Sequence, residues 1–224
     1  DAAGVLTGTL PIVVVAVMVT AVPAIPIVAL RSPLEVLGDL LVIVGLLALA
    51  RFALVLLALD AGSSFGGMAA SREAAIASLV EPGLLLAVGV AIKAAGSTQL
   101  SAFAERGSEL GPALLSLPML LAAAAFGIAA IAETGHEPVD NPDTHLELTM
   151  IHEGMLLEAS GRRLALLTYA SHLKFVVVIG LFAAIFVPFG AAGASSGTAL
   201  LGGALVAGLK LGVAAVLAAL LDAG

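Results

Sequence analysis

Six long apolar stretches constrain the fold of this chain more than any other feature of its sequence. They lie at about residues 10–30, 36–59, 80–98, 112–132, 164–189 and 198–221. Each approaches the roughly 20 residues that a helix needs to cross a membrane, and none alternates polar and apolar residues as barrel strands do. Because only helices and closed barrels satisfy their backbone in lipid, we expect a single all-α domain over residues 1–224, a polytopic transmembrane bundle with about six spanning helices.

The composition supports this fold and narrows the function classes. Of the 224 residues, 61% are hydrophobic and 11% are charged, and the mean hydropathy is +1.17. The net charge of −7 argues against nucleic acid as a partner. There is no cysteine to ligate a conventional iron–sulfur cluster. We therefore expect no cofactor on this chain and any redox centre on another subunit.

One polar segment, residues 133–163, interrupts the apolar pattern. It carries seven of the sixteen acidic residues and three of the four histidines. The loops on its side hold Arg72, Arg162 and Arg163, against Arg31 and Arg106 on the other side, which slightly favours a cytoplasmic location for it. Neighbouring carboxylates in partial burial resist ionising together, so the segment is a candidate for proton transfer. The alternative is a solvated surface loop whose charges bind a partner.

The sequence Asn141-Pro142-Asp143 predicts a helix start inside this segment, with Asn141 as its N-cap. The helix would run to about residue 160 and end at Gly161. On such a helix Glu147 and Glu158 share one side.

A metal or hydrolytic centre in this segment is not supported. His145 and His152 are seven residues apart, about 10 Å along a helix, which is too far for one metal ion. The HEGML string has Leu156 where a HExxH motif needs its second histidine. No activated nucleophile is recognisable either.

Ionisable residues also fall inside or beside the apolar spans. Arg51 lies within the second span, where an unpaired cation is costly, so we expect it to face protein or water; the alternative is that it snorkels to the nearer surface. Glu81-Pro82 is expected to open the third span, with Pro82 at a first helical position, after a short surface helix. Together these groups could line a hydrated proton path, or they could be unrelated pairs; the other candidates are Lys93, His172, Lys174 and Lys210.

The strings ETGHEPVDNPDTHLELTMIHEGMLLEASGRRLALL and LDAGSSFGGMAASREAAIASLVEP resemble the loops of the respiratory-chain NADH dehydrogenase subunit 1 family. The most similar branch is that of membrane-bound hydrogenases, formate hydrogenlyase (its subunit 4) and hydrogenase-4 (its component C). Members of the family are longer, so the chain is expected to be a fragment that lacks an N-terminal and a C-terminal span.

The resemblance implies a non-redox integral membrane subunit that anchors a peripheral electron-transfer arm and couples electron transfer to proton or sodium movement. It implies location in the inner (plasma) membrane beside hydrogenase-like large and small subunits, an iron–sulfur subunit and antiporter-like membrane subunits. Iron–sulfur clusters and a nickel–iron site or flavin would belong to those partners. The candidate relay and docking residues are then Glu81, Glu133, His136, Asp140, Glu147, Glu153 and Glu158.

Two alternatives stay open. The chain could be a purely structural anchor for a soluble arm, or it could form the quinone site of an NADH:quinone oxidoreductase. His136 stands where the family has Arg or Lys, Glu137 stands where a small or apolar residue is usual, and Ala159 replaces a Tyr. These departures favour a branch without quinone.

Overall fold

The computed structural model describes residues 5–137, 139–140, 150–193 and 197–222, and over these residues it is helical with no strand. Six helices are long and apolar enough to cross a membrane, which confirms the predicted all-α bundle. They are α1 (Val5–Ala21), α2 (Leu40–Asp60), α3 (Ser64–Ala95), α6 (Leu117–Thr134), α8 (Arg162–Phe186) and α9 (Gly197–Leu221). The shorter elements are η1 (Val22–Ala24), η2 (Glu35–Leu37), α4 (Leu100–Glu105), α5 (Gly107–Leu114) and α7 (His152–Leu156).

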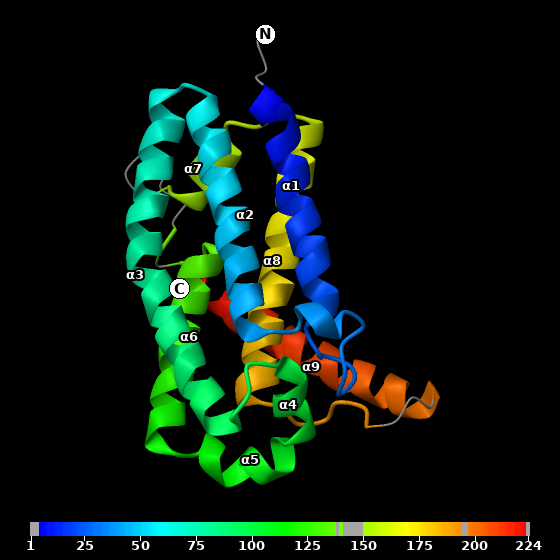
Figure 1. The fold of residues 1–224 in the computed structure, drawn as a ribbon. Coiled ribbons are helices and arrows are strands. Elements are labelled where there is room, and N and C mark those ends of the chain that lie inside the picture. The colour runs from blue at the N-terminus through cyan, green and yellow to red at the C-terminus, as the bar shows by residue number, and fades with distance from the viewer. Residues whose placement is uncertain (1–4, 138, 141–149, 194–196, 223–224) are drawn as a thin grey trace.

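Five of the long helices form a closed ring. Each packs on its neighbours in the order α1, α2, α3, α6, α8 and back to α1. The short helix α7 contacts α2, α3 and α8, and α9 packs against α8 outside the ring. In Figure 1, α4 and α5 lie at one end of the bundle and α7 lies toward the other. Side chains from α2, α3, α6 and α8 therefore lie in the middle of the ring.

The core of the ring combines small residues with a few large ones. Many of its buried residues are alanines of α2, α3 and α6, and small side chains let membrane helices approach closely. Between α6 and α8, the ring of Phe126 lies 5.8 Å from that of Phe182 and 5.8 Å from that of Phe186. This apolar packing surrounds the few charged side chains that the bundle buries.

Two prolines stand differently in the helices. α1 ends at Ala21, just before Pro23, and proline in a helix interior removes a backbone donor. Pro82, however, does not begin the third span, because it lies inside α3. That helix begins at Ser64, where the Ser63 hydroxyl caps it by accepting a hydrogen bond from the Gly66 amide at 2.8 Å. The predicted surface helix and the third span are therefore one helix of 32 residues.

Candidate functional site

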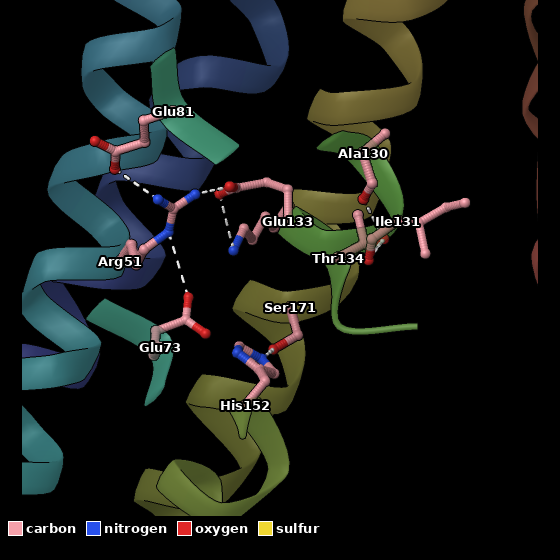
Figure 2. A network of polar contacts seen from close by, with 10 residues as sticks. Arg51, Glu73, Glu81, Ala130, Ile131, Glu133, Thr134, His152 and Ser171 are labelled. Carbon is pink, nitrogen blue, oxygen red and sulfur yellow. Dashed lines mark hydrogen bonds and ion pairs between the residues drawn. The ribbon is translucent and has the colours of Figure 1, made fainter. Parts of the chain in front are cut away.

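Arg51 lies at the centre of the ring and contacts three carboxylates. Its side chain is only 6% exposed, and it projects from the middle of α2. Nε lies 3.3 Å from Glu73, Nη1 lies 2.5 Å from Glu81, and Nη2 pairs with Glu133. Figure 2 shows the three acids arranged around the guanidinium. The expectation that Arg51 faces protein is confirmed, and it does not snorkel to a surface.

The continuity of α3 is what brings two of these acids to Arg51. Glu73 and Glu81 are eight residues apart, about 12 Å along one helix and close to the same face. Both acids precede Pro82, which lies in the interior of α3, and membrane helices tolerate such a proline when neighbouring groups compensate. The ion pairs from Arg51 to both acids tie the part of α3 before Pro82 to α2. The predicted helix start at Pro82 is therefore wrong, because the helix that holds Glu73 and Glu81 continues through it.

Lys174 of α8 adds a second cation to the cluster. Its Nζ lies 3.0 Å from Oε1 of Glu133, and both side chains are buried. Glu133 is the next-to-last residue of α6, which ends where Gly135 adopts a positive φ of 69°. The site thus brings together three acidic and two basic side chains. We call Arg51, Glu73, Glu81, Glu133 and Lys174 the charge cluster.

Asp140, in the polar segment after α6, binds the backbone at the start of α7. The buried Asp140 carboxylate accepts hydrogen bonds from the amides of Ile151 and Glu153, at 2.9 and 3.0 Å. It therefore caps α7 from outside that helix. The predicted helix from Asn141 to residue 160 is wrong where the structure describes it, because α7 spans only His152–Leu156. Ile151 is not helical, and its amide is bound by Asp140.

Glu158 attaches the end of this segment to the start of α3. Its carboxylate pairs with the hydroxyl of Ser63, the residue that caps α3. Gly154 of α7 lies so close to α3 that a Cβ there would come within 3.0 Å of the Cβ of Ala69. Glu158 is therefore engaged at the surface of α3 and not within the charge cluster.

His152 joins α7 to α8 beside the charge cluster. Its Nε2 lies 3.1 Å from the hydroxyl of Ser171, as Figure 2 shows. Burial, together with the nearby positive charges of Lys174 and Arg51, lowers the pKa of His152 to about 3. The imidazole of His152 is therefore neutral at physiological pH.

The other candidates lie away from the charge cluster. His136 Nδ1 lies 2.8 Å from Asp222 after α9, and Glu153 is exposed. Nζ of Lys210 donates to the carbonyls of Val187 and Phe189, both at 2.6 Å. Three further candidates remain: Lys93 is exposed at the end of α3, His172 is exposed and bonds to its own helix at Thr168, and Glu147 lies outside the described residues.

Glu73 was not among the predicted site residues. The segment that holds it was expected to contain a short surface helix before a third span opening at Glu81-Pro82. The spacing of eight residues between Glu73 and Glu81 is a helical signal, but it applies only if one helix carries both residues. Ser171 was missed as well, since one serine in an apolar span carries no distinguishing pattern.

The comparison with protein families matches residues 1–223 to a family model described as NADH dehydrogenase. The chain belongs to this family. Two relatives from Escherichia coli (strain K12) show how members of it compare with the chain. "Formate hydrogenlyase subunit 4" is 37% identical over 222 residues, 99% of the chain and 71% of that protein. "Hydrogenase-4 component C" is 38% identical over 220 residues, 98% of the chain and 68% of that protein.

A solved structure of this architecture matches as well. It is the membrane-bound sulfane sulfur reductase, an archaeal respiratory membrane complex, with a TM-score of 0.73. The match covers 98% of the chain and 72% of the other, at 21% identity, and supports the fold. With its six spanning helices, the present member of the NADH dehydrogenase family is a multi-pass membrane protein.

Proposed function

We propose that the chain is an integral membrane subunit of a multisubunit hydrogenase-like oxidoreductase and that the charge cluster relays ions in step with electron transfer. The observation that carries the proposal is Arg51, buried at mid-helix and bound by Glu73, Glu81 and Glu133. Placing a charged side chain inside a membrane protein costs free energy, and such side chains mark ion pathways. The relatives' names, a formate hydrogenlyase subunit and a hydrogenase-4 component, support the kind of complex.

A gradient of side-chain exposure across the charge cluster supports the proposed relay. Side-chain exposure rises from Glu133, at 2%, through Glu73, at 10%, to Glu81, at 38%. A proton or other cation that enters beside Glu81 would meet successive carboxylates arranged around one guanidinium. Glu133 then connects this path to Lys174 on α8. The cluster thus links the more exposed side of α3 with the far wall of the ring.

The assembly around the chain is also part of the proposal. We infer partners that carry the redox chemistry: hydrogenase-like large and small subunits with iron–sulfur clusters and a nickel–iron site or flavin, an iron–sulfur subunit, and antiporter-like membrane subunits. The peripheral arm would dock at the α7 end of the bundle, which we place on the cytoplasmic side of the inner membrane. Glu153 is exposed there and available to a partner.

The test compares Glu81→Gln with Glu153→Ala in the assembled complex. If the cluster relays ions, Glu81→Gln lowers ion translocation per electron transferred while the arm stays bound. Glu153→Ala should weaken docking without changing that ratio. A complex in which Glu81→Gln and Glu133→Gln both leave ion translocation and electron transfer unchanged would overturn the relay and leave the purely structural anchor. Labelling of this chain by a photoreactive quinone analogue would instead favour the quinone-site alternative.

A further inference from the structure

A small cavity lies between α1, α2, α7 and α8, next to the charge cluster. Its volume is about 20 Å³. Its polar lining is Arg51, His152, Ser171 and Lys174, and the rest is apolar. Roughly 10–15 Å³ of such space, with two to four polar partners, is enough to hold one water molecule. Cavities lined only by apolar groups stay dry, whereas this cavity has four polar residues in its lining.

The hydrogen bonds around the cavity leave donors and an acceptor for a ligand. The single proton of the Ser171 hydroxyl is donated to the carbonyl of Leu167 at 3.1 Å. Ser171 must therefore accept from Nε2 of His152. With its proton on Nε2, the neutral ring of His152 presents Nδ1 as an acceptor.

The cations beside the cavity have donors to spare. An ammonium has three N–H groups, and among the described residues Lys174 has one ion-pair partner, Glu133. Nε of Arg51 is buried and, although it lies near Glu73, makes no hydrogen bond to any described residue. Buried donors without acceptors are destabilising, and an ordered water is the usual remedy.

We propose that this cavity binds one ordered water molecule, which accepts from the cations of the charge cluster and donates to Nδ1 of His152. The water would join Lys174 to the His152–Ser171 pair and so extend the polar chain from α3 and α6 to α7. A water at this position would extend the hydrogen-bonded path of the charge cluster from Lys174 to α7. That relay role rests on the proposed function, whereas the water site does not.

The site is tested by resolving ordered water in the assembled complex. In the wild-type complex we expect density within hydrogen-bond distance of Lys174 Nζ and His152 Nδ1. Ser171→Val fills the space and removes the acceptor for Nε2, so the density should be lost; Ser171→Ala leaves room and should retain it. If Ser171→Val does not assemble, Ala50→Val narrows the same cavity from α2. A dry wild-type cavity, or water that persists in both valine variants, would overturn the proposal.

The relay role is measured separately, as ions translocated per electron. We expect a fall in Ser171→Val and a smaller fall in Ser171→Ala. If Glu133→Gln lowers the ratio and Ser171→Val does not, the cluster relays ions without this branch. If Glu133→Gln has no effect, the proposed function fails, and the water density still decides the site.

Discussion

At the scale of single residues, the chemistry of the guanidinium explains why an arginine occupies position 51. Its planar fork offers five N–H donors, so three carboxylates from α3 and α6 can bind one side chain. An ammonium is a compact point charge that cannot reach all three. The buried charges therefore depend on Arg51 as a connector between helices.

Removing Arg51 should destabilise the bundle far more than removing an exposed arginine. Arg51→Gln leaves three carboxylates without their shared cation, and breaking a buried pair in this way costs about 3–5 kcal/mol. The control is Arg31→Gln, whose pair with Glu105 is largely exposed and is worth at most about 1 kcal/mol. Thermal unfolding of the purified complexes measures both, and similar melting temperatures for the two variants would contradict the buried cluster.

His152 provides a pH test at the same scale. Its pKa of about 3 in the folded chain lies below the ordinary 6.5. Between these pH values the unfolded chain binds a proton that the folded chain does not, so stability falls as the pH drops through 6.5 toward 3. The contribution is at most about 1.4 kcal/mol per pH unit. We expect melting temperatures of His152→Gln to vary less with pH in this window than those of the wild type, and identical pH profiles would contradict the lowered pKa of His152.

At the scale of elements, the start of α3 packs tightly against its neighbours, and two adjacent glycines test this. A Cβ on Gly66 would come within 2.9 Å of the backbone oxygen of Ala58 and of Cγ of Glu158, while one on Gly67 would meet nothing within 4 Å. We expect Gly66→Ala to cost about 1–3 kcal/mol by overpacking. Gly67→Ala should be neutral or stabilise α3 by up to about 1 kcal/mol. Equal melting temperatures would show that the end of the polar segment does not pack on α3.

Elements also show how far the sequence could predict the structure. The six spans follow from length and hydropathy, because lipid demands long apolar helices. Local signals failed where distant residues decide the outcome. Pro82 suggests a helix start, but it lies inside α3, and ion pairs from Arg51 hold the part of α3 before it to α2. The Asn141 cap suggested a long helix, yet the carboxylate of Asp140 binds the amides at the start of α7.

The candidate site was predicted only in part, for the same reason. Arg51 and Lys174 stood out because ionisable residues are conspicuous in apolar spans. Glu81 stood out at the expected boundary of a span, and Glu133 as the first residue of the polar segment. Nothing in their spacing along the chain indicated that four helices bring them together. Glu73 was missed because its role depends on one helix carrying it together with Glu81.

At the scale of the whole molecule, the packing of α1, α2, α3, α6 and α8 in a ring brings the residues of the charge cluster together. No single helix could do so. The short helix α7, in the described part of the polar segment, contacts three of the ring helices. The bundle therefore connects the charge cluster to the end at which, under the proposed function, a soluble arm would dock.

The most direct test of the central claim is a double-variant measurement of ions translocated per electron in the assembled complex. Glu133→Gln and Lys174→Met each break the contact between α6 and α8 that completes the cluster. Residues that act as one unit are not additive. If the cluster is a single relay, the double variant loses no more than either single variant. Losses that multiply in the double variant, or two single variants that keep the wild-type ratio, would contradict it.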